Sequence, residues 1–272
     1  MHTLSSDALA CAERLRHGPA ILVSVEQGQG SVPRENGAWM AVFADQVIGT
    51  IGGGHLEWSA IASAQAQLPT ATEPWHDEVA LGPSLGQCCG GRVRLRFEPI
   101  SAQDRERLSA RLLPTLHPVT LFGGGHVGHA IVQALAPLPF AVHWVDSRDG
   151  VFPDHLPNQT NTEHSEPVHL AVPDIAPHSR VLIMSFSHAE DLDIVAACLQ
   201  RQRERHDLPL VGLIGSQTKR ATFSRRLRER GFGDAELQHI TCPIGLPGIT
   251  GKAPAVIGAS VAAQLLMHLY TI

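Results

Sequence analysis

The first hundred residues alternate between short runs of apolar side chains and short polar turns. Such runs, bounded by Gly, Pro, Asn or Asp, are typical of β-strands. Apolar residues recur at helical spacing over 56–68, and the first 20 residues form an amphipathic helical pattern. The pattern predicts a small N-terminal α+β domain over residues 1–100. Its expected strands lie at 21–26, 38–43, 47–51, 78–81 and 93–98.

Residues 117–272 follow a different rhythm, in which apolar strands alternate with helices. The run VTLFGGGHVGHAIVQAL at 119–135 is a strand, a glycine turn and an amphipathic helix in succession. This α/β alternation predicts a Rossmann-like parallel-sheet domain, joined to the first domain by a linker helix over 101–116. Residues 147–180 are expected to be the least regular part. Further strands are expected at 141–146, 168–172, 181–186 and 210–214, and helices at 190–204, 217–230 and 253–267.

A glycine motif opens the second domain. Gly123, Gly125 and Gly128 form the pattern GxGxxG between a predicted strand and a predicted helix, and Asp146 ends the next strand. In dinucleotide-binding proteins the first glycine makes the turn, the second admits pyrophosphate, the third lets the helix pack, and the acid accepts from a ribose hydroxyl. NAD(P) is therefore one candidate ligand, and the presence of Arg148 keeps the form with a phosphorylated ribose among the candidates.

The tetrapeptide GGGH occurs twice, each time between a strand-like run and a helix. The first copy runs from Gly52 through Gly53 and Gly54 to His55, and the second ends at His126. Both place backbone N–H groups at a helix N-terminus, where a phosphate-sized anion could bind. A tight turn that needs glycine for its backbone angles explains the first copy equally well.

The adjacent thiols of Cys88 and Cys89 are the sharpest chemical feature of the chain. They are followed by two glycines and by a strand in which basic and apolar side chains alternate. Flexible backbone would expose the sulfur atoms, and the basic strand face would lower their pKa or hold an anion. The pair could bind a soft metal, relay sulfur or form a redox pair; the alternative is one buried and one incidental cysteine. The alternating basic residues are Arg92, Arg94 and Arg96, for which a solvated face is the default.

Polar residues follow two further strands, at the edge where open α/β sheets bind ligands. The group after strand 181–186 also suits a helix N-cap and first turn. Residues 215–219 open an arginine-rich helix, and the loop over 241–252 contributes Cys242 and Lys252. The polar group that follows strand 181–186 consists of Ser187, His188, Glu190, Asp191 and Asp193.

Composition excludes several classes of function. A formal net charge of -5 and an isoelectric point near 6.3 give no global field for capturing nucleic acid. The longest apolar stretch, 253–267, is too short for a membrane span, and the first 20 residues lack the apolar core of a secretory signal. Five cysteines with no pattern of pairs favour a cytoplasmic protein, and the absence of CxxC, HxxxH or HExxH counts against zinc.

Taken together, these segments resemble the xanthine dehydrogenase accessory proteins of the XdhC and CoxI family. The resemblance covers nearly the whole chain. It rests on GSVPRENGAWM at 30–40, TIGGGHLEW at 50–58, LGPSLGQCCGGRV at 81–93, LFGGGHVGHA at 121–130, WVDSR at 144–148, GSQTKRATFSRRL at 215–227 and CPIGLPGITGK at 242–252.

The resemblance implies a cytoplasmic chaperone, more than an enzyme, that binds molybdenum cofactor, a pterin that carries a phosphate and a dithiolene-held molybdenum. Such a protein shields the cofactor, presents it to a cysteine desulfurase for sulfuration and inserts it into apo-xanthine dehydrogenase. The family's cysteine-glycine-glycine motif singles out Cys89, with Cys88 beside it, for contact with molybdenum. A homodimer is also implied.

Two departures from the family's pattern are visible. Relatives commonly carry GAGH where this chain has GGGH, and alanine in place of Gly124 is expected to leave the turn almost unchanged. The final helix begins APAVIGAS, so no acidic role is available at Ala253 or Ala255.

Two other functions remain open from the sequence. One is an NAD(P)-dependent oxidoreductase that uses the Rossmann-like domain, although no proton-transfer constellation points to a substrate. The other is a sulfurtransferase that holds a persulfide on Cys88 or Cys89.

Overall fold

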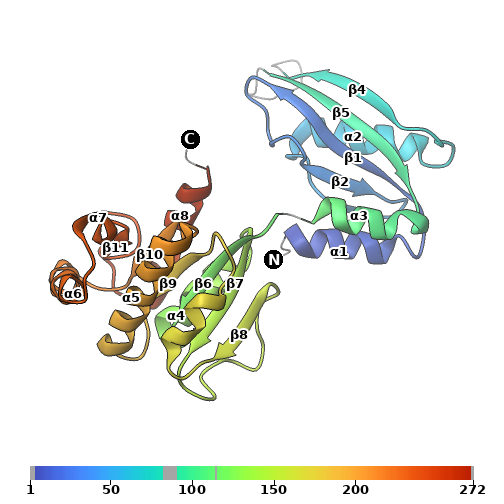
Figure 1. Cartoon of the computed structure of the whole chain (residues 1–272). Helices are drawn as coiled ribbons and strands as arrows, with labels where there is room; N and C mark the ends of the chain where they lie inside the picture. The colour runs from blue at the N-terminus through green and yellow to red at the C-terminus, as the bar shows by residue number, and fades with distance from the viewer. Residues whose placement is uncertain (1–3, 82–90, 114, 271–272) are drawn as a thin grey trace. The chain divides into compact units, whose positions relative to one another are not determined.

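The structure, a computed structural model, describes residues 4–81, 91–113 and 115–270 (Figure 1). Its contacts divide the chain into two compact units, residues 1–114 and 115–272. The first contains an antiparallel sheet and the second a parallel sheet, each packed with helices. This arrangement confirms the fold class predicted from the sequence.

The first unit is built on five antiparallel strands in the order β3-β2-β1-β5-β4, with β1 at the centre. The long pairing of β1 with β5 holds together segments that are far apart in the sequence. The strands are β1 (Ala20–Gln29), β2 (Trp39–Val42), β3 (Val47–Gly49), β4 (Trp75–Ala80) and β5 (Arg92–Ile100). The helices are α1 (Leu4–Arg14), α2 (Gly54–Gln67) and α3 (Arg105–Leu112), and Ala102–Asp104 forms a 3-10 turn.

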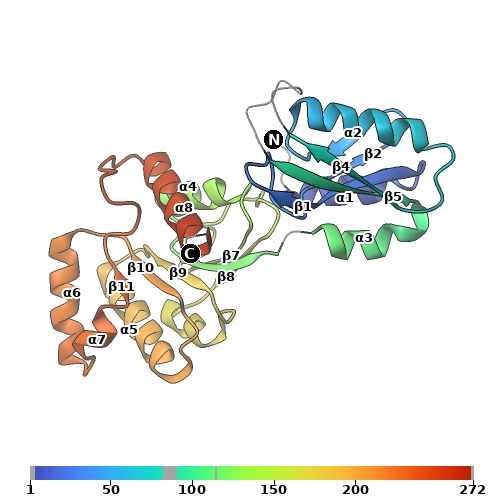
Figure 2. The ribbon, with the colours of Figure 1, turned by 90° about the horizontal axis from the view of Figure 1, so that it is seen from above.

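Both faces of this sheet are covered because β1 is apolar on both. Ile21 and Val23 belong to the core under α2, whereas Ala20 and Leu22 belong to the core under α1 and α3. Figure 2 shows α2 on one side of the sheet and α3 on the other. Helix α3, which the sequence assigns to a linker over 101–116, packs against α1 within the first unit.

The second unit is a fully parallel sheet in the order β11-β10-β9-β6-β7-β8. Read from β8, this is the 3-2-1-4-5-6 order of the Rossmann fold. The chain starts at the centre of the sheet, builds one half, and returns past its first strand to build the other. The strands are β6 (His117–Phe122), β7 (Phe140–Asp146), β8 (Thr160–His164), β9 (Arg180–Ile183), β10 (Leu210–Leu213) and β11 (Ile240–Thr241).

Helices cover both faces of the parallel sheet, which is why its central strands are continuously apolar. Helices α4 and α8 enclose one core with Trp144, and α5, α6 and α7 enclose the other with Ile183. Figure 2 shows α4 and α8 on one side and α5 on the other. The helices are α4 (His126–Leu135), α5 (His188–Arg205), α6 (Gln217–Glu229), α7 (Asp234–Leu237) and α8 (Pro254–Tyr270). Among the described helices, none is long and apolar enough to cross a membrane.

The strand predicted at 168–172 is wrong. These residues belong to a 3-10 helix, Val168–Asp174, whose buried Val168, Ala171 and Val172 pack near α5. The third strand of the second unit is instead β8, inside the stretch expected to be least regular. Because β8 lies at the sheet edge and is largely exposed, its sequence TNTEH lacks apolar alternation.

Candidate functional site

The candidate site lies at the carboxyl ends of the parallel strands in the second unit. Strand order reverses at β6, so the connections after β6 and β9 leave the sheet in opposite directions. Ligands of open α/β sheets bind at such a switch point. The residues that follow these strands are 123–126 after β6, 147–148 after β7 and 184–187 after β9.

The three glycines of the GxGxxG motif have different surroundings. Gly123 has a φ of +123°, and a Cβ there would lie 2.1 Å from the carbonyl oxygen of Met184. A Cβ on Gly128 would lie 2.1 Å from the carbonyl oxygen of Gly123, so α4 packs directly on the turn. A Cβ on Gly125 would meet no atom of the described residues within 4 Å. Gly123 and Gly128 are thus required by packing, whereas the backbone at Gly125 faces open space.

Helix α4 begins immediately after Gly125, and none of the described side chains caps its N-terminus. The first N–H groups of a helix have no intrahelical partner and carry partial positive charge. His126 is exposed at the first helical position, whereas His129 packs edge-on against Trp144 with ring centroids 4.8 Å apart. The N-terminus of α4 therefore offers uncapped donors beside one exposed imidazole.

Gly124 corrects an expectation from the sequence. A Cβ at this position would lie 2.7 and 2.8 Å from the two methyl carbons of Val151, and 3.3 Å from Oδ2 of Asp146. The chain after β7 folds back over the glycine turn and fills this space. Alanine at 124 would therefore force a shift, and the expectation that it leaves the turn almost unchanged is wrong for this chain.

Asp146, at the end of β7, is 2% exposed and holds two segments of the site together. Its Oδ2 accepts from the N–H of Gly124 at 2.5 Å and from Nη2 of Arg148 at 2.9 Å. Its Oδ1 accepts from the N–H and the Nε of Arg148, at 2.8 and 2.9 Å. Burial alone would raise the pKa of Asp146, but the hydrogen bonds from Arg148 and Gly124 outweigh it and hold the pKa below its usual value.

The guanidinium of Arg148 also reaches the loop after β9. Its carbon lies 4.8 Å from the ring centroid of Phe186, which is 68% exposed. Ser147 donates to Oε1 of Glu190 at 2.8 Å, and the buried Oε2 of Glu190 has no hydrogen-bond partner among the residues that the structure describes. The hydrogen bonds that Arg148 donates to Asp146 raise the pKa of Arg148, with a smaller contribution from the charge of Glu190. Arg148 thus links the ends of β7 and β9 as a permanent cation.

A buried ion pair lies farther along the same edge. Nζ of Lys219 contacts Oδ2 of Asp191 at 2.6 Å and donates to the carbonyl of Ile214 at 2.9 Å. Oδ1 of Asp191 accepts from the N–H and hydroxyl of Ser185, at 2.8 and 2.7 Å. The pair ties α6 to α5 and to the end of β9, which gives these polar residues a structural role.

The remaining polar residues at these strand ends also have structural partners. Ser187 caps α5 by accepting from the N–H of Glu190 at 3.2 Å, and Asp193 pairs with Arg230 at 2.7 Å. His188 stacks edge-on against Phe223. Lys252 is exposed.

The three described cysteines are free and buried. Burial raises the pKa of Cys11 to about 11 and that of Cys198 to about 12. It also raises the pKa of Cys242, although Lys219 and Arg220 oppose this effect. A buried thiol with a raised pKa is a poor nucleophile and a poor metal ligand. The pair on which the sequence placed its sulfur chemistry, Cys88 and Cys89, lies outside the described residues.

At the first GGGH segment the Glu57 carboxylate takes up two backbone donors, although the described side chains do not cap α2 at its N-cap residue Gly53. Oε2 of Glu57, in the first turn of α2, accepts from the N–H groups of Ile51 and Gly53 at 3.0 and 3.1 Å. This carboxylate places a negative charge beside the turn that contains Gly53, Gly54 and His55, where the sequence suggested that an anion could bind. His55 itself is hydrogen-bonded to Ser59 at 3.1 Å.

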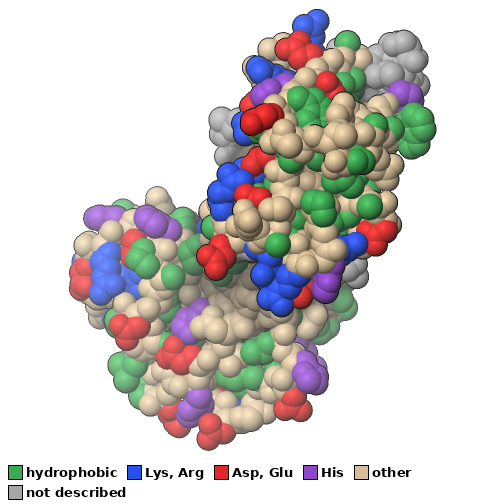
Figure 3. Space-filling model, turned by 90° about the vertical axis from the view of Figure 1, so that its right-hand side faces the viewer, with side chains coloured by type: hydrophobic (Ala, Val, Ile, Leu, Met, Phe, Trp, Pro, Cys, Tyr) green, Lys and Arg blue, Asp and Glu red, His purple; other side chains and the backbone are tan. Residues whose placement is uncertain are grey.

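The basic face of β5 is not a free cationic surface. Each of its three arginines has a carboxylate partner within the sheet, which matches the default expected for a solvated face. Figure 3 shows basic and acidic side chains lying beside one another on one face of the molecule. The pairs are Arg92–Glu78 at 3.8 Å, Arg94–Glu26 at 3.1 Å and Arg96–Glu98 at 3.8 Å.

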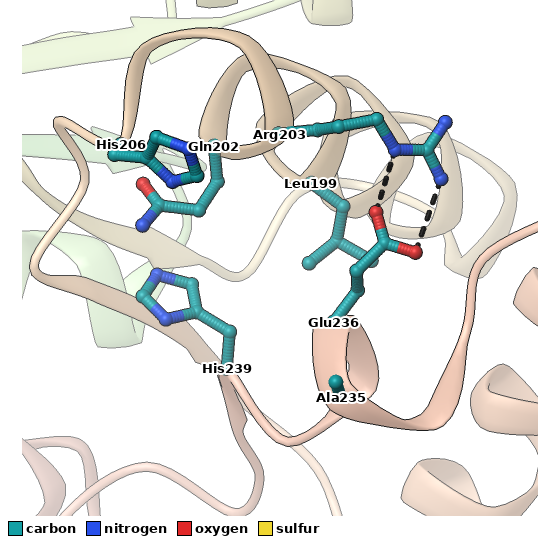
Figure 4. A pocket seen from close by; sticks show the side chains of 7 residues that line it. All are labelled: Leu199, Gln202, Arg203, His206, Ala235, Glu236 and His239. Atoms are coloured by element: carbon teal, nitrogen blue, oxygen red, sulfur yellow. Dashed lines mark hydrogen bonds and ion pairs between the residues drawn. The ribbon is translucent and has the colours of Figure 1, made fainter.

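A separate pocket of about 240 Å³ lies between the end of α5 and α7 (Figure 4). On one side Arg203 forms two hydrogen bonds to Glu236, and on the other lie His206, Gln202 and His239. The end of α5 precedes β10, so this pocket is at the amino edge of the sheet, away from the glycine turn. No motif in the sequence pointed to it, because its residues come from helix ends and are scattered over 199–239.

Comparison with known proteins identifies the parts of the chain. Residues 119–265 match the model of the XdhC Rossmann domain, and residues 14–74 match that of the XdhC and CoxI family. The chain is 29% identical over 255 residues to an uncharacterized protein, YqeB, of Escherichia coli K12. The match covers 91% of this chain and spans 43% of the length of that relative.

The fold also matches a solved structure. A crystal structure described as a xanthine dehydrogenase from Bacillus halodurans superposes with a TM-score of 0.78 and 18% sequence identity. The match covers 96% of this chain and 95% of that one. At this level of identity the likeness concerns the fold.

Proposed function

The chain belongs to the XdhC and CoxI family, and from this membership we propose that it acts in the maturation of a xanthine dehydrogenase by carrying molybdenum cofactor. In this role it binds the cofactor, protects it, presents it to a cysteine desulfurase and delivers it to the apoenzyme. The partners that we propose are this desulfurase, the client enzyme and a second copy of the chain. The free state of the three described cysteines supports a reducing, cytoplasmic setting.

The observation that carries the proposal beyond family membership is the turn between β6 and α4. The residues there fit the phosphate of a pterin cofactor, since the backbone at Gly125 faces open space and α4 has no side-chain cap. The N–H groups of the first turn of α4 would hold the phosphate, and the exposed His126 lies beside them. The first GGGH segment fits less well, because the Glu57 carboxylate already accepts from Gly53 and the preceding Ile51 and would repel a phosphate there.

For sulfur contact with the metal we propose Cys88 and Cys89, as the family's cysteine-glycine-glycine motif implies, and the state of the other cysteines supports this choice. Each of the three described thiols is buried, and for each the pKa is raised. A thiolate ligand must be accessible and deprotonated. When bound, molybdenum cofactor would supply the metal centre that the client enzyme uses. The chain's own contributions would be the backbone donors of the turn before α4 for the phosphate and a thiolate for the metal.

The test is the molybdenum and pterin content of the full chain purified from cofactor-replete cells, compared with Cys88→Ala and Cys89→Ala. We expect a near-stoichiometric load in the wild type and its loss in at least one variant, because the thiolate is the metal contact. Cys11→Ala is the matched control and should keep its load, since that thiol is buried. Absence of molybdenum and pterin from the wild type, even after anaerobic addition of cofactor, would contradict the proposal.

The same samples test the sulfurtransferase alternative. A persulfide on Cys88 or Cys89 after treatment with a cysteine desulfurase would appear as about 32 Da of added mass in the alkylated protein. Its absence from both residues, together with a normal cofactor load, leaves the carrier role.

A further inference from the structure

We infer that Arg148 is the residue that keeps dinucleotides out of the Rossmann-type site, because it engages the carboxylate that would otherwise bind the adenosine ribose. This role deepens the proposed function by naming a ligand class that the site refuses, and it rests on that function only for the identity of the accepted ligand. It concerns the fingerprint Gly123, Gly125, Gly128 and Asp146, which by itself is typical of NAD(P) binding.

A ribose bound at the end of the second strand needs a carboxylate with free acceptor positions. A carboxylate has about four such positions. All four hydrogen bonds of Asp146 come from the protein: three from Arg148 and one from the N–H of Gly124. With 2% of its surface exposed, Asp146 has neither a free lone pair nor a face open to a ribose hydroxyl.

A ribose hydroxyl would compete poorly with Arg148 for the Asp146 carboxylate. The two side-chain contacts from Arg148 join opposite charges, and hydrogen bonds of this kind are roughly twice as strong as neutral ones. A ribose hydroxyl could replace them only with a neutral donor. Displacing the guanidinium would also break its contact with Phe186, at 4.8 Å. The pair between Asp146 and Arg148 is therefore expected to persist in the presence of NAD.

NADP meets a different obstacle at the same place. Its 2′-phosphate could pair with an arginine near the end of the second strand. Here Arg148 already shares its charge with Asp146, whose pKa is held below its usual value, so the carboxylate is ionised at neutral pH. A phosphate brought to Arg148 would lie beside this negative charge and be repelled by it. The same residue pair thus disfavours both dinucleotides, for different reasons.

Isothermal titration of NAD and NADP into the full chain tests this role, using wild type, Arg148→Met and Arg148→Ser. The wild type should not saturate with either ligand at concentrations up to about 1 mM. Both variants free Asp146, and methionine keeps an apolar side chain against Phe186, so NAD affinity should rise at least about tenfold. NADP should stay weak in both variants, because Asp146 still repels the 2′-phosphate.

Arg203→Met is the matched control. Arg203 also forms two hydrogen bonds to a carboxylate, Glu236 at 2.7 and 3.0 Å, and its guanidinium carbon lies 5.1 Å from the ring centroid of Phe232. It lines the pocket at the amino edge of the sheet (Figure 4), so its loss should leave NAD affinity unchanged. A gain in this control equal to that in the Arg148 variants would mean that the effect is not local to the glycine turn.

Two results would overturn the role of Arg148: NAD binding to the wild type as tight as to the variants, or a folded Arg148 variant without any gain. Circular dichroism and the unfolding midpoint identify the folded variants. If neither Met nor Ser is tolerated, Arg148→Lys keeps the charge but has a single ammonium in place of the planar fork, and a smaller gain is expected. Failure of the carrier role would appear in the molybdenum and pterin content, so the two failures are distinguishable.

Discussion

At the scale of single residues, Gly124 and Val151 form a steric pair that can be tested by substitution. Gly124→Ala should destabilise the second unit by about 1–2 kcal/mol, because its Cβ would overlap the Val151 methyl groups. In the double variant with Val151→Ala most of this cost should disappear, which gives a non-additive cycle. Thermal unfolding of the four proteins measures it, and a cost that is unchanged in the Val151→Ala background would contradict the packing.

Gly125→Ala provides the internal control for this cycle. It adds the same methyl group one residue later, where nothing lies within 4 Å. Its effect on the unfolding midpoint should be far smaller, since substitutions that make no new clash usually stay within about 0.5 kcal/mol.

The same residues show how far sequence reasoning reaches at this scale. Spacing was enough to place Asp146 at the end of β7, because strand and glycine motif are local patterns. It did not reveal that Arg148, two residues away, turns back onto that carboxylate, because side-chain direction depends on what packs around it. Likewise, the sequence did not show that Glu57 accepts hydrogen bonds at the first GGGH turn, because only the fold of α2 brings its carboxylate to the N–H groups of Ile51 and Gly53.

At the scale of elements, the contact between α5 and α6 contains one buried and one exposed ion pair. Lys219→Met should cost about 3 kcal/mol, because it leaves the Asp191 carboxylate buried without its counter-ion. Arg230→Met removes the exposed pair with Asp193 and should cost less than about 1 kcal/mol. The unfolding midpoints of both variants measure the difference, and equal shifts would show that burial does not decide the strength of this contact.

The strands of the parallel sheet differ in how readily their sequences predict them. β6 and β9 are covered on both faces by helices, so their apolar runs identified them directly. β8 pairs with one strand only and has a polar sequence, so its hydrophobic pattern did not predict a strand. A strand was predicted at 168–172 instead, because these residues form a short apolar run. Such a run does not distinguish a strand from a buried 3-10 helix.

At the scale of the whole molecule, each of the two units has its own hydrophobic cores. We expect the fragments 1–114 and 115–272 to fold separately, each with a cooperative thermal transition. Trp144 is the single tryptophan of the second fragment, so its fluorescence reports that unit alone. A second fragment that lacks a cooperative Trp144 transition would show that its sheet depends on the first unit.

The order of strands in the parallel sheet has a consequence for synthesis on the ribosome. The central strand β6 emerges before both of its neighbours, and β9 follows roughly 60 residues later. At an elongation rate of about 5–20 residues per second, the backbone N–H and C=O groups along one edge of β6 stay unpaired for roughly 3–12 s, until β9 has been made. During this interval α4 and β7 can already cover the rest of the strand. The nascent chain is thus most vulnerable to aggregation between the completion of β7 and the arrival of β9.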